Sequence, residues 1–336
     1  MYTVGLDVDT HSIMKIAGVI ALKKYKNLPL SELLCGGEGT NYFSSHYISS
    51  PSPAPGWRGG PRAEIKDFSG LPTIHPGNSI EKISDHLKKH EKPSGEAEFG
   101  YYLAGLIEGN GYFGNKGLEI LFFEKDITLA YYIKKRIGYG SVYRIKDKRT
   151  VKYVLIHPAG LKFVLDLVNG KFLTKYKIYQ LLKHKYDKKF DTIILPPANF
   201  SLKTNHWLSG FTDSDGYFSI STPKDKFTKP YGDIRVRLRF VLGQKDPTIL
   251  KKVKSEFGGY LYRFKSTDNY LLNLSSFSEN LKVIEYFDKF NLNSIKYLAF
   301  FKWRKAYRIV QRKEHLTKKG LSKIKLLGKS ISELIK

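Results

Sequence analysis

The chain has 336 residues, 41% of them hydrophobic, and carries 57 Lys and Arg against 31 Asp and Glu, a net charge of +26. This length and apolar content suit one large or two medium folded domains and exclude a wholly disordered polycation. A single cysteine, Cys35, excludes an internal disulfide and a cysteine-rich zinc site. The apolar stretch at 16–22 is too short to span a bilayer.

The basic charge is concentrated after residue 97. Residues 1–97 carry 11 Lys and Arg against 10 Asp and Glu, whereas the remaining residues carry 46 against 21. Such a charge keeps a protein soluble but repels itself in a compact fold, and a polyanionic partner relieves that repulsion. The sequence therefore favours a nucleic-acid-binding protein over one that is generally basic.

The N-terminal part has the composition of a linker. Between residues 36 and 80, 21 of 45 residues are Gly, Pro or Ser, and the run at 49–56 is incompatible with a helix or a central strand. We expect a disordered linker over 36–95 after a leader over 1–35. A short polar helix is expected at about 79–90, and ordered structure from Glu96 onward.

The rest of the chain contains an internal repeat. The segment LAGLIEGNGYF at 103–113 recurs as LSGFTDSDGYF at 208–218, which is 105 residues later. Further along, 140–146 recurs as 259–265 at an offset of 119, so the second copy has extra residues just after its motif. They fall at 221–232, where two prolines and a glycine indicate a longer hairpin loop.

Each copy has the same predicted order: a motif helix, two strands, a helix, two strands and closing helices. The helical parts are expected at about 97–108, 127–137, 158–168 and 174–185 in the first copy and at about 203–213, 247–257, 278–287 and 294–310 in the second. Hairpin-connected strands in this αββαββα order predict an α+β fold with antiparallel sheets. Two such units, 96–186 and 202–336, joined by a linker at 187–201, predict a pseudo-symmetric pair.

Each motif helix has small residues four positions apart. Gly105 and Gly109 hold these positions in the first copy, and Gly210 and Ser214 hold them in the second. Residues at this spacing lie on one helix face and let two helix backbones approach closely. Because glycine inside a helix costs about 1 kcal/mol relative to alanine, we expect the two motif helices to pack against each other at these residues.

An acidic residue and a glycine-containing turn end each motif helix. Glu108 lies directly before Gly109, and Asp213 lies three residues before Gly216. A carboxylate at a helix C-terminus opposes the macrodipole, which is unfavourable for stability but suits cation binding. One such residue alone would be an ordinary acid at a frayed helix end. Two in matched positions predict a shared divalent-metal site.

The paired motif resembles that of the LAGLIDADG homing endonucleases in their single-chain, two-motif form, over about residues 97–313. The resemblance implies that the motif helices form the interface between the halves and that the two sheets form a DNA-binding saddle over the major groove. It implies Mg²⁺-dependent cleavage of both DNA strands by a monomer, with two or three ions between the halves. The metal ligands that it implies are Glu108 and Asp213.

The resemblance also implies amide and basic side chains near the reactive phosphate. Gln244 fits this role at a strand end in the second copy, while its counterpart Glu124 departs from the pattern and moves the role to Lys125. Such residues organise water and stabilise phosphate charge. Further candidates are Lys245 and the lysines that open the last helix of each copy, which are Lys175 and Lys177 in the first copy and Lys296 in the second.

One predicted strand carries arginines on a single face. Arg235, Arg237 and Arg239 alternate with apolar residues, so they share one side of the strand. A β-ribbon fits the major groove and arginine pairs bidentately with guanine, which favours DNA reading over an edge strand kept soluble by charge. The equivalent first-copy strand has Glu119 there, which predicts an asymmetric target. Further DNA-contact candidates are Asn115, Lys116, Tyr143, Arg144, Lys146, Lys148, Lys152, Lys224, Lys226, Arg263 and Lys265.

The first ten residues, MYTVGLDVDT, resemble a loop of cytochrome c oxidase subunit I. The resemblance implies an open reading frame inside a mitochondrial intron that continues from the upstream exon, and it makes 1–35 an exon-derived leader. It implies a location in the mitochondrial matrix, with no membrane association of the mature domain. The intronless exon junction is then the expected DNA partner.

Two other functions stay open. An RNA maturase of this fold would bind intron RNA and assist the splicing of its own intron, with or without DNA cleavage. A DNA-binding regulator would have the fold without the chemistry. The motif acids favour the endonuclease, a Mg²⁺-dependent hydrolase of phosphodiester bonds that starts intron homing.

Overall fold

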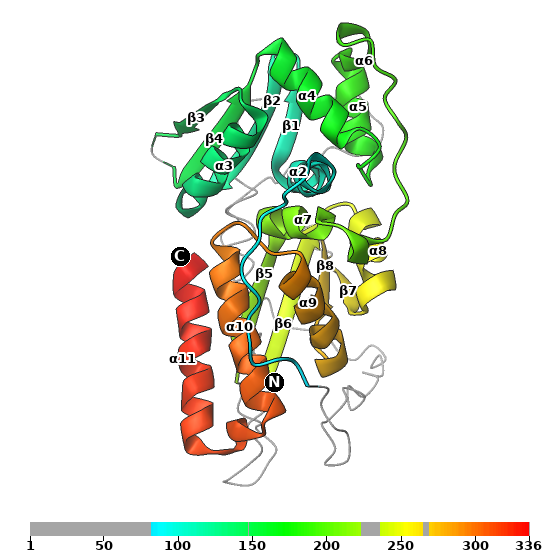
Figure 1. The fold of residues 1–336 in the computed structure, drawn as a ribbon. Coiled ribbons are helices and arrows are strands. Elements are labelled where there is room, and N and C mark those ends of the chain that lie inside the picture. The colour runs from blue at the N-terminus through cyan, green and yellow to red at the C-terminus, as the bar shows by residue number, and fades with distance from the viewer. Residues whose placement is uncertain (1–81, 147, 223–235, 265–268, 336) are drawn as a thin grey trace, which may run out of the picture.

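The computed structural model describes residues 82–335 apart from 147, 223–235 and 265–268, and this part consists of two similar α+β halves (Figure 1). The expected leader at 1–35 and most of the expected linker at 36–95 lie outside the described residues. The first half is at the top of Figure 1 and the second half is below it.

The first half follows the predicted order of elements. They are α2 (Glu96–Asn110), β1 (Gly111–Gly114), β2 (Gly117–Phe123), the 3-10 turn η3 (Glu124–Asp126), α3 (Ile127–Ile137), β3 (Ser141–Arg144), β4 (Thr150–Leu155), α4 (Pro158–Val168), α5 (Lys175–Lys183) and α6 (Tyr186–Lys189). A connector then leads to the 3-10 turn η4 (Leu202–Thr204) and the second half.

The second half repeats this order and adds a helix. Its elements are α7 (Trp207–Asp215), β5 (Gly216–Ser221), β6 (Arg237–Gln244), α8 (Thr248–Phe257), β7 (Tyr260–Phe264), β8 (Asn269–Leu274), α9 (Phe277–Lys289), α10 (Lys296–Gln311), the 3-10 turn η5 (Glu314–Leu316) and α11 (Lys318–Ile335). The predicted αββαββα repeat is therefore confirmed, and α11 extends it.

Each half contains one antiparallel four-stranded sheet. The strand orders are β1-β2-β4-β3 and β5-β6-β8-β7, so the two sheets have the same topology. Residues alternate between buried and partly exposed along β2, β4 and the start of β6. One face of each sheet is thus packed against helices, and the other face carries the partly exposed side chains. The α+β prediction with antiparallel sheets is confirmed.

Helices α2 and α7 lie side by side between the two sheets (Figure 1). A Cβ atom on Gly105 would lie 1.9 Å from the carbonyl oxygen of Trp207, and one on Gly210 would lie 1.9 Å from that of Tyr102. Neither position can accept a larger residue without separating the helices. The small residues thus allow the close helix contact that their spacing predicted.

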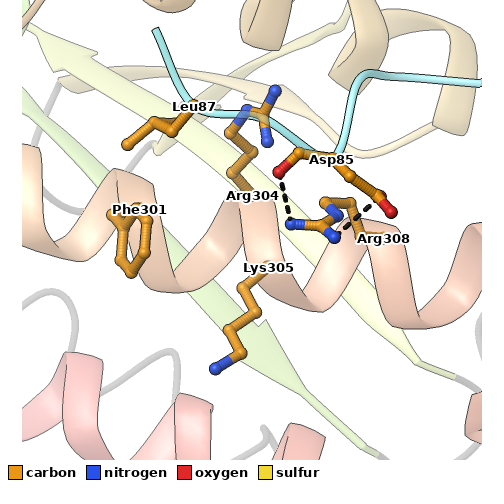
Figure 2. Close-up of a pocket in the computed structure, with 6 residues that line it drawn as sticks. All are labelled: Asp85, Leu87, Phe301, Arg304, Lys305 and Arg308. Atoms are coloured by element: carbon orange, nitrogen blue, oxygen red, sulfur yellow. Dashed lines mark hydrogen bonds and ion pairs between the residues drawn. The ribbon is translucent and has the colours of Figure 1, made fainter. Parts of the chain in front are cut away.

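Residues 82–94 form an extended segment, here called the strap, that packs on α10 of the second half. Ile83 is buried in the hydrophobic core. Arg304 donates a hydrogen bond from Nη2 to the carbonyl of Ser84 at 3.0 Å, and Arg308 pairs with Asp85 at 2.7 Å. Figure 2 shows both arginines rising from α10 beneath the strap. These long-range contacts fix the first part of the strap in place.

The strap then crosses to the first half. The N–H of Glu91 donates to Asn291 Oδ1 in the second half at 2.7 Å, whereas Arg136 of α3 donates to the carbonyl of Pro93 at 2.5 Å. The polar helix predicted at about 79–90 is wrong for the described residues 82–90, which are not helical. Side chains of other elements bind the strap's backbone groups, so an extended conformation replaces the helix that local sequence favours.

Helix α11 packs beside β5 and α10 in the second half (Figure 1). Its residues Ile324 and Ile331 are buried in the core, and Lys125 of the first half donates to the carbonyls of Glu333 and Leu334 near its end. Among the described residues, no helix has the length and apolar character needed to cross a membrane. The apolar side of α11 is instead occupied by the fold itself.

Candidate active site and nucleic-acid interface

Glu108, near the end of α2, is buried and binds the start of α5 in its own half. Its Oε1 accepts the N–H groups of Leu173 at 2.8 Å and Thr174 at 2.9 Å, and its Oε2 accepts the Thr174 hydroxyl at 2.8 Å. N–H groups that open a helix lack intrahelical partners, so a carboxylate is a favourable acceptor for them. Burial raises the pKa of the Glu108 carboxyl, although nearby Lys177 opposes that rise.

Asp213 likewise accepts hydrogen bonds in the second half, from residues that lie just before α10. Its Oδ1 accepts the N–H of Ser294 at 3.2 Å and the Ser294 hydroxyl at 2.5 Å. Its Oδ2 accepts the N–H of Asn293 at 2.8 Å and the hydroxyl of Tyr102 at 2.7 Å. Burial raises the pKa of the Asp213 carboxyl, and these hydrogen bonds oppose the rise.

These hydrogen bonds leave little acceptor capacity for the metal-ligand role that the sequence predicted for Glu108 and Asp213. A carboxylate has about four acceptor sites; Asp213 uses four of them and Glu108 uses three. A metal that took these oxygens would leave buried N–H groups without acceptors, which is costly. The matched acids of the repeat therefore hold the closing helix of each half in place.

Asn110 and Asp215 lie two positions further along, where the two packed motif helices α2 and α7 end. This place is called the seam below. Each is the last residue of its helix. A Cβ atom on Gly109 of α2 would lie 2.5 Å from Asp215 Oδ2, so this carboxylate of α7 reaches the first half. Gln244, the last residue of β6, donates from Nε2 to the same oxygen at 2.7 Å. The predicted site residue Gln244 is thus beside the seam.

The two halves differ at this seam. The first half has the neutral amide of Asn110, which is buried, where the second half has the carboxylate of Asp215. Sequence reasoning missed this pair because it took the first acid of each motif as the ligand. The signal was present in the alignment of LAGLIEGNG with LSGFTDSDG, which pairs Asn110 with Asp215 and shows the unequal charge directly.

A lysine lies at the C-terminal end of each motif helix. Lys296 donates from Nζ to the carbonyls of Thr212 and Ser214, each at 2.9 Å, and buried Lys177 donates to the carbonyl of Gly111 at 2.5 Å. A cation here complements the negative end of the helix dipole. Burial lowers the pKa of Lys296, whereas nearby carboxylates, including that of Asp215, raise it.

The other predicted basic residues are placed differently. Lys175 is exposed at the start of α5, and Lys177, two residues later, occupies the buried position instead. Lys125 points at the end of α11, where it binds two backbone carbonyls. Lys245 follows Gln244 and is partly exposed. The structure therefore groups Lys296 with Asp215 and Gln244, whereas Lys175 is exposed on α5 and Lys125 is bound to the end of α11.

The partly exposed face of the second sheet is basic. Arg237 and Arg239 of β6 alternate with buried Leu238 and Phe240, as the sequence predicted, and Arg239 donates to Ser221 Oγ on β5 at 3.1 Å. The further candidate Arg263 is exposed on β7. Arg235, Lys224, Lys226 and Lys265 lie outside the described residues.

The corresponding face of the first sheet is partly neutralised. Lys152 of β4 pairs with Glu119 of β2 at 3.1 Å, and Arg144 of β3 pairs with Glu124 at 3.0 Å. The described parts of the two faces therefore differ in charge. The remaining candidates are exposed: Asn115 and Lys116 in the β1–β2 turn, Tyr143 on β3, and Lys146 and Lys148 in the β3–β4 turn.

Comparisons with known proteins agree with this geometry. A family model described as LAGLIDADG endonuclease matches residues 208–307. Over 260 residues the chain is 44% identical to the cox1 intron-2 37.2 kDa protein of Schizosaccharomyces pombe, a match that covers 75% of this chain and 79% of that protein. The chain belongs to the LAGLIDADG endonuclease family.

More distant relatives and similar solved structures match as well. The intron-encoded DNA endonuclease aI3 of Saccharomyces cerevisiae is 25% identical over 295 residues, covering 72% of this chain and 71% of that protein. Among solved structures, the meganuclease I-AabMI bound to uncleaved DNA has a TM-score of 0.54 at 23% identity, covering 69% of this chain and 98% of that one. I-SmaMI bound to its uncleaved DNA target with calcium ions has a TM-score of 0.55 at 20% identity, with the same coverage.

The LAGLIDADG endonuclease family uses divalent metal. At the seam the two halves offer different groups to such an ion. Among the described residues, no group of three or more His, Cys, Asp or Glu side chains forms a closed metal site. Asp215 is partly exposed. The hydrogen bond that it accepts from Gln244 is made to Oδ2. Mg²⁺ is commonly held by one or two carboxylates together with water and substrate phosphates. The seam supplies one carboxylate and one carboxamide for this purpose.

Asp126, the last residue of η3, reaches from the first half toward the second. Its Oδ1 accepts the N–H of Ile295, the residue before Lys296, at 2.6 Å. Burial raises the pKa of Asp126 to about 6, despite this hydrogen bond and the charge of Lys296. Its repeat partner Asp246 instead accepts the N–H and hydroxyl of Thr248 within its own half. The contact across the halves is therefore a feature of the first copy.

Replacing Asp126 with asparagine is expected to stabilise the protein above about pH 6 and to have little effect near pH 4. Because the folded-state pKa of about 6 lies above the ordinary value of 3.8, ionisation of this carboxyl opposes folding as pH rises through that window. The cost approaches roughly 3 kcal/mol at neutral pH. Asparagine keeps an acceptor for the N–H of Ile295 without ionising. Urea unfolding at both pH values measures the difference, and a pH-independent difference would contradict this account.

Proposed function

We propose that this protein is a metal-dependent, site-specific DNA endonuclease encoded in an intron of the mitochondrial cox1 gene. The observation that carries the proposal is the seam at which Asp215, Gln244 and Lys296 meet between two similar sheets. Its relatives include a cox1 intron protein and an intron-encoded DNA endonuclease, and the similar solved structures were determined with DNA. Its substrate would be the intronless cox1 exon junction, in the mitochondrial matrix.

The residues at the seam have separate roles in phosphodiester hydrolysis. When bound, Mg²⁺ would act as a Lewis acid on a phosphate oxygen. Asp215 would hold the ion through the oxygen that Gln244 leaves open, and the Gln244 amide fixes the orientation of that carboxylate. Lys296, held by the carbonyls of Thr212 and Ser214, supplies positive charge for the phosphate. Lys177 is the corresponding cation of the first half.

The two sheets would position the DNA. Arg237 and Arg239 present guanidinium groups that suit guanine edges or phosphates, while Lys152 on the first sheet is paired with Glu119. The two half-sites are therefore expected to differ in sequence. Because one chain supplies both halves, 96–186 and 202–336, a monomer is sufficient for the reaction.

The test is cleavage of a duplex of about 40 base pairs that spans the intronless cox1 exon junction. The protein should contain residues 82–336, since the strap is part of the fold. We expect strand cleavage at one site that requires Mg²⁺ and is absent from a duplex of the same composition in scrambled order. Equal treatment of both duplexes would contradict the proposal.

The amide at Asn110 favours a second candidate, an RNA maturase that assists the splicing of its own intron. With one carboxylate at the seam instead of two, metal binding is weaker and the basic surface remains. In that case the protein would bind the exon junction without cutting it in Mg²⁺. It would then raise the splicing rate of the intron RNA, and Asp215→Asn would leave that rate unchanged.

A further inference from the structure

Helix α11 carries a cluster of exposed lysines. It has five of them and one acidic residue, Glu333, over its length. Lys319 and Lys323, and likewise Lys325 and Lys329, stand four residues apart, where like charges repel on a helix surface. The exposed lysines are Lys318, Lys319, Lys323, Lys325 and Lys329. Their mutual repulsion opposes the stability of the isolated helix, so helix stability does not explain this cluster.

The apolar side of α11 is already covered. Ile324 and Ile331 are buried, and Leu327 and Leu334 pack against the same core. A basic amphipathic helix with a free apolar side would suit a membrane surface. Here that side is occupied, so the lysines are the part of α11 available to a partner.

Gly328 fixes the orientation of α11 against the sheet. A Cβ atom there would lie 3.1 Å from the carbonyl oxygen of Ile220, so the helix touches the outer strand β5 at this point. At 3.6 residues per turn, Lys325 and Lys329 lie about 60° and 100° from Gly328, on the side away from the buried residues. Lys318 lies on the same side. Lys319 and Lys323 lie about 180° and 140° from Gly328, on the far side of the helix.

Helix α11 lies on the helix-covered side of the second sheet at its β5 edge, because Gly328 meets the side chain of Ile220, which packs against the core. The side of α11 that carries Lys318, Lys325 and Lys329 faces outward past that edge. The opposite face of the sheet is the basic one. On β5, Ser221 and Ser219 pair with Arg237 and Arg239 of β6, so this face reaches β5 through small residues. Beyond β5 lies α11. The chain thus places lysines beyond the β5 edge, one strand away from Arg237 and Arg239 of β6.

The size of the sheet points to the partner. The outer strands of a four-stranded sheet are about 14 Å apart, whereas the major groove is about 12 Å wide. DNA that receives such a sheet in its major groove must bring its phosphate backbones to the sheet edges. Phosphate oxygens are therefore the groups that lysines at the β5 edge would meet.

We propose that Lys318, Lys325 and Lys329 of α11 bind the DNA phosphate backbone along the β5 edge of the second half-site. This proposal rests on the proposed DNA binding by the two sheets. Phosphate contacts fix position and affinity and carry no sequence information. The first half ends in a connector at the corresponding place, so this backbone contact belongs to one half-site.

The test compares two matched double variants, Lys325→Gln with Lys329→Gln and Lys319→Gln with Lys323→Gln. Affinity for the exon-junction duplex and for its scrambled counterpart is measured over a range of KCl concentrations. The first variant should reduce the slope of log affinity against log salt by about 2, equally for both duplexes. The second variant should retain the wild-type slope. Circular dichroism and thermal unfolding establish that both variants fold.

The outcomes separate this proposal from the proposed function. Equal slopes for the two double variants, or a wild-type slope in the first, would overturn the role of α11. Loss of preference for the exon junction over the scrambled duplex by the first variant would also overturn it, because phosphate contacts do not read sequence. A wild-type protein that does not prefer the junction would contradict the proposed function, while a reduced slope in the first variant would still support the α11 contact.

Discussion

Replacing Asp215 with asparagine is expected to lower the cleavage rate at the exon junction by about 10³-fold while DNA affinity stays within about threefold. Asp215 is the carboxylate that crosses the seam, and Gln244 orients it from β6. Asparagine keeps the shape of the side chain but removes the charge that attracts a divalent ion. Single-turnover cleavage in Mg²⁺ measures the rate, and binding of the same duplex in Ca²⁺ measures the affinity.

Glu108→Gln is the matched control for this change. A glutamine can still accept the N–H groups of Leu173 and Thr174 and can donate to the Thr174 hydroxyl. We expect it to lower the free energy of unfolding by about 1 kcal/mol and to leave the cleavage rate of folded protein within about threefold. A folded Glu108→Gln protein without cleavage, beside an active Asp215→Asn protein, would restore Glu108 as the metal ligand.

The Asn110→Asp variant is expected to bind divalent metal at least about tenfold more tightly than wild type, because a second carboxylate joins Asp215 at the seam. Two carboxylates close together repel each other without a cation. The variant should therefore unfold at a lower temperature than wild type in EDTA and recover that loss in Mg²⁺. The Mg²⁺ concentration that gives half of the maximal cleavage rate should fall accordingly.

The thermal measurement distinguishes metal binding from other causes. An Asn110→Asp protein that is equally destabilised in EDTA and in Mg²⁺ would mean that the two positions do not share an ion. The double variant Asn110→Asp with Asp215→Asn moves the single carboxylate to the first half. Its change in unfolding temperature between EDTA and Mg²⁺ should be close to that of wild type. A response as strong as that of Asn110→Asp alone would contradict a shared site.

Much of the fold could be predicted because its signals are local. The repeated motif, the hairpin-spaced strands and the apolar periodicity predicted both halves, and the helix expected at 127–137 matches α3 (Ile127–Ile137) residue for residue. The glycine spacing predicted the contact between α2 and α7, because only small residues let two helices approach so closely. The sequence signals for these features lie within a few residues of each other.

The features that sequence reasoning missed depend on contacts between distant residues. The carboxylate of Glu108 accepts the N–H groups of Leu173 and Thr174, which lie more than 60 positions away, and no local signal predicts that contact. Lys175 and Lys177 both suited a basic role, and only the burial of one side of α5 separates them. The sequence predicted a short polar helix at about 79–90 within the linker, whereas Arg304 and Arg308 hold the strap in an extended conformation from α10.

The central claim is that Asp215, and not Glu108 or Asp213, holds the metal at the seam. The most direct test is a calorimetric titration of Ca²⁺ into complexes of the exon-junction duplex with wild type, Asp215→Asn and Glu108→Gln. The account predicts that Ca²⁺ binding is retained in Glu108→Gln and is lost or at least tenfold weaker in Asp215→Asn, on the order expected for loss of a charged ligand. Unchanged Ca²⁺ binding by the Asp215→Asn complex, with binding lost in Glu108→Gln, would contradict it.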